Sequence, residues 1–556
     1  MGSEFGVTPD TKPELRLDAV GVFWIVFAVI WTLVVLGGMT FLYVRRDIPI
    51  LRIRGLPLSL ASVALLHFYW FAVTLGYVYG PLMPEVAEFW IMSIWFPFGV
   101  ALFHASNSRF LYVARAQKKF VMSAVDSGWD PDRPRIRKTM LARWRMLDYS
   151  YKMLLLVGLG MSFQLFLTLF MFIISRKFHS SVGIPGTEVT GTAMEQKTEQ
   201  GRGWEWWPSV VWQLFWAWIV APVILWRARH LRDTQGWRAQ TIACCLSGLH
   251  ASPMWLIALY VPGMAPVNQY FIPPQWIALS IMMMEIFTIF IPCWEVRKQQ
   301  ALCQETLDSI ARWESRQKSA THCGKSLTSG TPSWMRKAES ISSSGNGSIL
   351  TMDALEHTLA KNPEPLQHFS ALRDFSGENI AFLTRIREWR AMYLIPASRL
   401  AAAAATATCP GDDEKTVSSA TTQVTTLSRE CFESALRIYM DFISSNSAEF
   451  QVNLSSQDFK NLQAVFEPAA RAMYGENASP DPATPFDEML PPRQLTADSQ
   501  EKMMRFRGDV PELFSDTVFD DSEMSIKYLV LTNTWPKFIK ERRSFDAASS
   551  VESGRT

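Results

Sequence analysis

The residue best placed to do chemistry in this sequence is Glu285, an acid in the middle of the apolar stretch 273–295. A charge in such a stretch is costly, so Glu285 could anchor a polar pocket or a signal relay inside a bundle of helices. It could equally form a structural hydrogen bond between helices, or stay protonated and neutral. His67, His104 and His250 lie in or near other apolar stretches, and for each of them we favour a structural role.

A second set of polar residues lies in the stretch 374–382, which reads Asp-Phe-Ser-Gly-Glu-Asn-Ile-Ala-Phe. We expect Ser376 to cap a helix whose first turn carries Glu378, because an acid is favoured at the N-terminal end of a helix. Apolar residues follow at helical spacing and point the opposite face inward. Glu378 and Asn379 would stay at the start of the helix, where a partner could reach them. Taken by itself, the pattern also fits an ordinary capped helix.

The two sets of residues lie in two unlike halves of a chain of 556 residues, and each half must position its own set. The first half contains seven mostly apolar stretches with the length of about 20 residues that a bilayer crossing needs. They are residues 19–44, 56–80, 89–113, 153–175, 207–226, 241–262 and 273–295. We therefore expect an outer N-terminal segment, residues 1–18, followed by a bundle of seven transmembrane helices over residues 19–297.

Basic residues in the short loops predict the orientation of this bundle. The loops on one side carry eighteen Lys and Arg residues and those on the other side six, which places the N-terminus outside and the C-terminal region in the cytosol. Termini on opposite sides of the membrane require an odd number of spans, and seven meets this requirement. We expect a multi-pass protein of the plasma membrane whose surroundings include the lipid bilayer. The net charge of +2 gives no argument for a nucleic-acid partner.

The second half is polar, and its apolar residues recur at helical spacing, which predicts an all-helical domain. Residues 298–349 are expected to be a cytosolic linker that begins as a helix (298–318) and continues as a flexible tether rich in Ser, Thr and Gly. The domain itself would span residues 350–545, with disordered insertions near 395–428 and 470–516, and residues 546–556 would be a tail. We find no metal cluster, no nucleophile beside a base and no glycine-rich phosphate loop. We therefore expect a domain built for contact, with no catalytic residue, cofactor or metal of its own.

Five short motifs follow one another in this domain. They are Asp374-Phe375-Ser376-Gly377-Glu378-Asn379-Ile380-Ala381-Phe382, Ala435-x-x-Ile438-Tyr439-x-x-Phe442-Ile443, Val452-Asn453-Leu454, Phe519-Asp520 and Trp535-Pro536-Lys537-Phe538. Each is weak alone, but in this order they resemble a regulator of G-protein signalling (RGS) domain. With seven spans ahead of it, the whole chain resembles the membrane-spanning RGS proteins of plants and fungi.

The resemblance implies a helical bundle that binds an activated Gα subunit and speeds its GTP hydrolysis, thereby acting as a negative regulator of heterotrimeric G-protein signalling. Such a domain supplies no catalytic residue, because Gα already holds its own Arg, Gln and Mg²⁺. It would bind best to the GTP-bound and transition-state forms of Gα. An alternative is a seven-transmembrane receptor that senses an unidentified extracellular or intramembrane ligand and uses the RGS-like domain mainly to dock Gα. A transporter-like bundle is less favoured, because the spans show no internal repeat.

Carried over by position, the resemblance implies that Gα is contacted by Asp374, Glu378, Asn379, Asn453, Leu529, Asn533, Thr534 and Lys537. Three of these residues depart from the family pattern. Asn533 stands where the family has an Asp that accepts a hydrogen bond from Gα, and an amide oxygen can still accept one without a charge. Thr534 replaces a Ser, and Lys537 replaces an Arg and so lacks the forked guanidinium geometry. These departures bear on the strength and selectivity of the contact with Gα.

Overall fold

The computed structural model describes residues 5–8, 10–122, 149–179, 181–323, 350–394, 429–445, 448, 450–474 and 509–553. Within these ranges the secondary structure is entirely helical and contains no strand. The chain divides into two compact units. The transmembrane unit comprises Met1–Val113 and Pro131–Arg297, and the C-terminal unit comprises Ala114–Asp130 and Lys298–Thr556.

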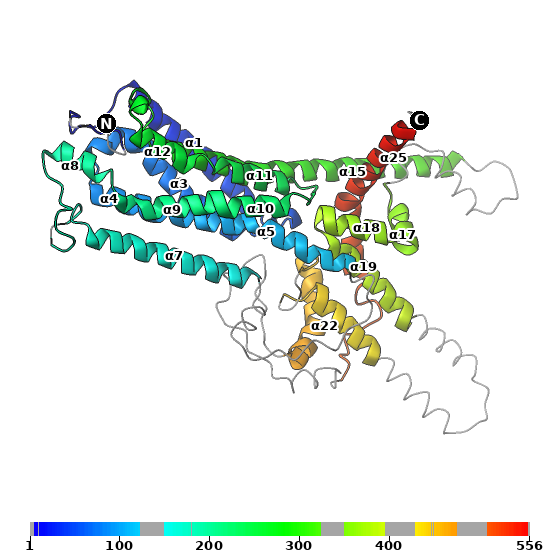
Figure 1. Cartoon of the computed structure of the whole chain (residues 1–556). Coiled ribbons are helices and arrows are strands. Elements are labelled where there is room, and N and C mark those ends of the chain that lie inside the picture. The colour runs from blue at the N-terminus through cyan, green and yellow to red at the C-terminus, as the bar shows by residue number, and fades with distance from the viewer. Residues whose placement is uncertain are drawn as a thin grey trace, which may run out of the picture. The chain divides into compact units, whose positions relative to one another are not determined.

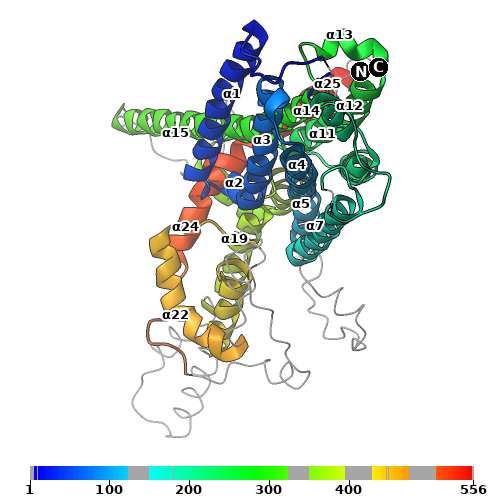
Figure 2. The same cartoon turned by 90° about the vertical axis from the view of Figure 1, so that its left-hand side faces the viewer.

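The transmembrane unit contains seven helical segments long and apolar enough to cross a membrane, as expected from the sequence for a multi-pass membrane protein. They run side by side in Figures 1 and 2. The first four are α1 (Ala19–Val44), α3 (Leu56–Tyr79), α4 with η2 and α5 (Glu85–Trp90, Ile91–Trp95, Phe96–Met122), and α7 (Tyr149–Ile174). The last three are α9 with η4 and α10 (Trp207–Phe215, Trp216–Val220, Ala221–Ala228), α11 with α12 (Trp237–Ser247, Ala251–Tyr260), and α14 with η6 and α15 (Gln275–Glu285, Ile286–Phe290, Ile291–Cys323).

Short helical segments lie between the spans: α2 (Pro49–Arg52), η1 (Gly80–Leu82), α8 (Ala193–Gln200), η3 (Trp204–Trp206), η5 (Pro262–Met264) and α13 (Ala265–Asn268). The start of α1 is fixed by Asp18, whose carboxylate accepts a hydrogen bond from the Gly21 amide (2.7 Å) and another from the Tyr77 hydroxyl (2.8 Å). The Gly21 hydrogen bond is the main reason that the pKa of Asp18 lies below its usual value. This cap also ties the beginning of α1 to the end of α3.

Three spans contain a π-helical turn directly ahead of a proline. Segments η2, η4 and η6 end at Trp95, Val220 and Phe290, two residues before Pro97, Pro222 and Pro292. A proline inside an α-helix clashes with the carbonyl four residues earlier and cannot donate to it. A wider turn relieves that clash and keeps the span helical across the proline.

The C-terminal unit is a bundle built around aromatic side chains. Its elements are α17 (Met352–Lys361), α18 (Glu364–Phe369), η7 (Ser370–Asp374), α19 (Gly377–Trp389), η8 (Arg390–Leu394), a helix over residues 429–442, α22 (Ser456–Tyr474), α24 (Asp520–Leu529), η9 (Val530–Thr534) and α25 (Trp535–Ser553). Phe466 stacks on Phe432 from the helix 429–442 and on Phe519, which precedes α24. All three rings are fully buried, and burying such rings contributes most to the stability of a small core.

The structure extends the ordered part of this unit beyond the expected boundaries. Helix α15 continues to Cys323, as expected for residues 298–318. Helix α22 runs to Tyr474, and the Phe514 ring packs against Trp389 and Phe466, so parts of the expected insertion 470–516 belong to the core. Helix α25 extends to Ser553, through most of the expected tail. The insertion 395–428 and most of the tether lie outside the described residues.

Candidate functional site

The transmembrane unit holds a buried group of polar side chains around Glu285, the last residue of α14. Glu285 Oε2 accepts a hydrogen bond from Trp31 Nε1 (2.7 Å), and Glu285 Oε1 lies 2.9 Å from His67 Nδ1. The other ring nitrogen of His67 lies 3.1 Å from Thr32 Oγ1. We call Trp31, Thr32, His67 and Glu285 the intramembrane polar cluster. It joins α1, α3 and α14, and Glu285 itself is only 1% exposed.

The sequence indicated Glu285 but not its partner. For His67 we expected a structural role, and the structure places it against Glu285, in a contact between α3 and α14. The signal that could have found the pair is the presence of two ionisable groups in different apolar stretches, because such groups commonly pair with each other. His104 fits the structural role better, since its ring stacks on Trp216 with centroids 5.5 Å apart.

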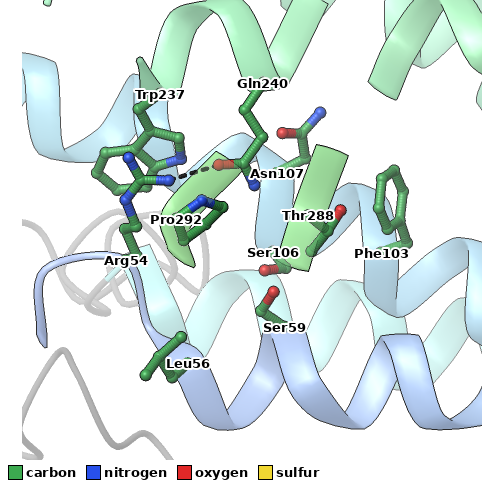
Figure 3. Close-up of a pocket in the computed structure, with 10 residues that line it drawn as sticks. All are labelled: Arg54, Leu56, Ser59, Phe103, Ser106, Asn107, Trp237, Gln240, Thr288 and Pro292. Atoms are coloured by element: carbon green, nitrogen blue, oxygen red, sulfur yellow. Dashed lines mark hydrogen bonds between the residues drawn. The ribbon is translucent and has the colours of Figure 1, made fainter. Parts of the chain in front are cut away.

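A small cavity lies near the start of α3, beside Arg54, Leu56 and Ser59, and Figure 3 shows the side chains that surround it. Arg54 donates to the Gln240 side chain and, over 2.7 Å, to the Gln235 carbonyl, and its guanidinium lies over the Trp237 ring. Burial lowers the pKa of Arg54 to about 10, so the side chain stays positively charged at neutral pH. The cavity volume of about 20 Å³ is enough for about one water molecule and too small for a metabolite.

In the C-terminal unit, Asp374 is the centre of a hydrogen-bond network that includes Ser376, Thr534 and Lys537, and all four residues were singled out by the sequence. Its Oδ2 accepts from the hydroxyls of Thr534 (2.8 Å) and Ser376 (2.9 Å), and its Oδ1 accepts from Lys537 Nζ (2.8 Å). Asp374 is fully buried and Thr534 nearly so. The network therefore joins η7 to η9 and α25, and it engages these side chains inside the unit.

The geometry corrects the expectation that Ser376 caps α19 with its side chain. Ser376 does occupy the N-cap position, but its hydroxyl bonds to Asp374 and makes no capping hydrogen bond. The chain turns sharply just before it, where Phe375 has a left-handed backbone (φ 52°). A Cβ atom at Gly377 would lie 2.7 Å from Ala371 Cβ, so the close approach of α19 to η7 requires glycine there.

Glu378 and Asn379 begin α19 but are less accessible than expected, at 8% and 5% exposure. Part of the cover comes from Gln117, a residue of the same unit that the sequence did not single out. Its amide oxygen accepts from the Gly377 N–H (3.0 Å), and its amide nitrogen donates to Glu378 (2.9 Å). Nearby, Phe120 packs against Phe442 and Phe450.

Two amide oxygens in this region have no hydrogen-bond partner among the described residues, those of Asn379 and Asn533. Both belong to the set singled out by the sequence. Asn453 and Leu529 are half-buried and share none of the hydrogen bonds of the Asp374 network in the described part of the chain. We call Asp374, Glu378, Asn379, Asn533, Thr534 and Lys537 the α19–α25 face.

In the α19–α25 face, the amide oxygens of Asn379 and Asn533 are acceptors without a partner among the described residues, and this chemistry suits binding. In the residues that the structure describes, no group of three or more His, Cys, Asp and Glu side chains could hold a metal ion. Comparisons with protein-family models, with curated proteins and with solved structures find no match to this chain. Its function must therefore be argued from its own residues.

Proposed function

We propose that this protein is a membrane-anchored negative regulator of heterotrimeric G-protein signalling, with a C-terminal RGS domain that accelerates GTP hydrolysis by activated Gα. The proposal rests first on the five ordered motifs between Asp374 and Phe538. The seven spans would anchor the domain at the plasma membrane. The excess of basic residues in the loops on one side favours an outer N-terminus and a cytosolic C-terminus.

The observation that carries the proposal is the pair of unpartnered amide oxygens on Asn379 and Asn533. A buried acceptor without a donor costs about 1–3 kcal/mol, and a donor supplied by a bound partner would remove that cost. In the family that the motifs resemble, the acid at the position of Asn533 accepts from a backbone N–H or a hydroxyl of Gα. The free oxygen of Asn533 is suited to that same task.

The remaining residues of the α19–α25 face act in this proposal by fixing the shape of the surface. The bonds from Thr534 and Lys537 to Asp374 hold η9 and α25 against η7, and Asn533 lies within η9. A surface held in this way can bind the switch segments of Gα in their transition-state conformation more tightly than in the ground state. Each 1.4 kcal/mol of such a difference gives about a tenfold faster reaction.

Single-turnover GTP hydrolysis by Gα, measured with the full chain in lipid nanodiscs, tests the proposal. We expect an acceleration of at least about tenfold over the slow intrinsic rate of about 10⁻² s⁻¹, together with binding to Gα in its aluminium-fluoride state. Asn461→Ala is a matched control for substitutions of Asn379 and Asn453, because Asn461 is an exposed asparagine of α22 whose side chain accepts a hydrogen bond from Gln457. The proposal would be refuted if the unaltered protein neither accelerated GTP hydrolysis nor bound Gα in its aluminium-fluoride state.

The intramembrane polar cluster favours a second candidate, a receptor whose spans bind a ligand and whose C-terminal domain mainly docks Gα. A buried pair such as His67 and Glu285 is the kind of group on which a ligand could act. Ligand-dependent nucleotide exchange on Gα would distinguish this function, because an RGS domain acts on hydrolysis and leaves exchange unchanged.

A further inference from the structure

The hydrogen bonds of the intramembrane polar cluster specify how many protons it holds. Thr32 donates its single hydroxyl proton to the Ala28 carbonyl (2.7 Å), so its oxygen can only accept from His67. His67 Nε2 must then carry a hydrogen. Trp31 is a donor only, and it donates to the Oε2 atom of Glu285.

This leaves the contact between His67 Nδ1 and Glu285 Oε1, at 2.9 Å. A neutral imidazole that carries its hydrogen on Nε2 presents a lone pair at Nδ1, and a carboxylate presents lone pairs as well. Two acceptors at this distance repel unless a proton lies between them. Either the carboxyl group of Glu285 donates to Nδ1, or an imidazolium donates to the carboxylate. In both cases the pair holds one proton and has no net charge.

Among the described residues, no charged side chain on the surrounding elements bonds to this pair. Both α1 and α14 pack on α3, and α11 and α12 pack on α14. The Trp70 ring stacks on His67 with centroids 5.2 Å apart. In the described part of the chain, no other ionisable side chain bonds to His67 or Glu285. The other ionisable side chains on these elements are Tyr43, Tyr69, Tyr77, Tyr79, Arg238, Cys244, Cys245 and Tyr260.

We propose that His67 and Glu285 form a proton-binding site that links spans one, two and seven only while one proton is bound. Loss of the proton leaves a net negative charge inside the bundle, which is costly there. If the remaining hydrogen of His67 then moves to Nδ1, Nε2 becomes an acceptor. The Thr32 hydroxyl can donate to Nε2 only by turning away from the Ala28 carbonyl. The ligand of this site is the proton itself, and the inference is independent of any interaction with Gα.

The stability of the full chain in lipid nanodiscs, measured as a function of pH, tests this site. A free histidine in the unfolded chain has a pKa of about 6.5. Above this pH the proposed site would hold one proton that the unfolded chain does not hold. The folded state then holds more protons than the unfolded state, so stability falls as the pH rises above this value. We expect the unfolding equilibrium constant to rise by up to about tenfold per pH unit, the dependence that one proton gives.

Glu285→Gln is the decisive variant, because an amide can still donate to His67 and accept from Trp31 but cannot release a proton. We expect this variant to lose the alkaline dependence, and His104→Phe, which alters a buried histidine that stacks on Trp216, to keep it. The same slope in the wild type and Glu285→Gln, or its loss in His104→Phe as well, would overturn the proposal.

Infrared difference spectra of the wild type between mildly acidic and alkaline pH provide a second test that does not depend on the folding of any variant. We expect the loss of a carboxylic-acid or imidazolium band at alkaline pH. Spectra that show a carboxylate beside a neutral imidazole throughout this range would also overturn the proposal.

Discussion

Replacing Lys537 with methionine should destabilise the C-terminal unit by about 3 kcal/mol. The substitution keeps the length of the side chain but leaves the carboxylate of Asp374, which is fully buried, without its ammonium partner. Removing one partner of a buried ion pair typically costs about 3–5 kcal/mol. We expect the lower end of that range because the Lys537 side chain is 17% exposed, so water can replace part of the lost interaction.

The double variant Asp374→Asn with Lys537→Met should be more stable than Lys537→Met alone. Asparagine carries no charge, and its amide oxygen can still accept from Thr534 and Ser376, which now donate to the carboxylate. We expect it to recover at least about 1 kcal/mol, since the cost of the single variant comes from an unpaired buried charge. The two substitutions are thus expected to be strongly non-additive.

Hydrogen exchange followed by mass spectrometry measures this effect locally in the full chain. For peptides from α19 and α25, a loss of 3 kcal/mol corresponds to about a hundredfold faster exchange, since each 1.4 kcal/mol is a factor of ten. Peptides from the transmembrane unit serve as the internal control. A change of less than about threefold in Lys537→Met, or a double variant less stable than the single one, would refute this account of the network.

Three further predictions concern other parts of the chain. Asn379→Ala or Asn453→Ala should weaken the proposed acceleration of GTP hydrolysis by about five- to tenfold, the contribution of about one hydrogen bond. The melting temperature should not fall, since the Asn379 oxygen has no hydrogen-bond partner among the described residues; a loss of the fold instead would make Asn379 structural. Gln117→Ala should tighten binding of the full chain to Gα in its aluminium-fluoride state, because it removes the hydrogen bonds that Gln117 makes with the Gly377 N–H and with the Glu378 carboxylate, and weaker binding would contradict the proposed face. Asp18→Ala should cost about 1 kcal/mol at pH 7, measured by thermal unfolding. Because the folded pKa of Asp18 is lowered, this contribution is present above its unfolded pKa of about 4 and disappears as the pH falls through the folded value, so wild type and variant should melt alike in strong acid.

The sequence predicted the elements of this fold better than the contacts between them. Seven spans could be located because a bilayer crossing requires a long apolar run, which is visible in any linear stretch of sequence. The pairing of His67 with Glu285 could not, because it depends on how spans far apart in the chain are rotated about their axes. Phe514 was assigned to an insertion because its neighbours are polar, yet one aromatic ring was sufficient to bring its segment into the core.

Within the α19–α25 face, the sequence indicated the participating residues but not which of them form hydrogen bonds inside the unit. Asp374 and Asn379 lie in the same motif, so the sequence predicts a contact with Gα for both of them. The structure separates them: among the described residues, Asp374 accepts from Ser376, Thr534 and Lys537, whereas the Asn379 oxygen has no donor. The contact of Gln117 with the start of α19 could not be predicted, because no local sequence pattern distinguishes a glutamine at the end of a long helix.

The π-helical turns have a consequence for insertions and deletions. Such a turn holds one more residue than the α-helix would need, and both candidate sites adjoin one: η6 follows Glu285, η7 ends at Asp374, and η9 contains Asn533. Deleting one residue of η9 would remove this extra residue and leave a regular α-helix. Deleting one residue of the regular helix α24 would instead rotate α25 by about 100° relative to the residues before the deletion. Lys537 would then point away from Asp374, so the helices tolerate a change of length at the π-helical turns better than elsewhere.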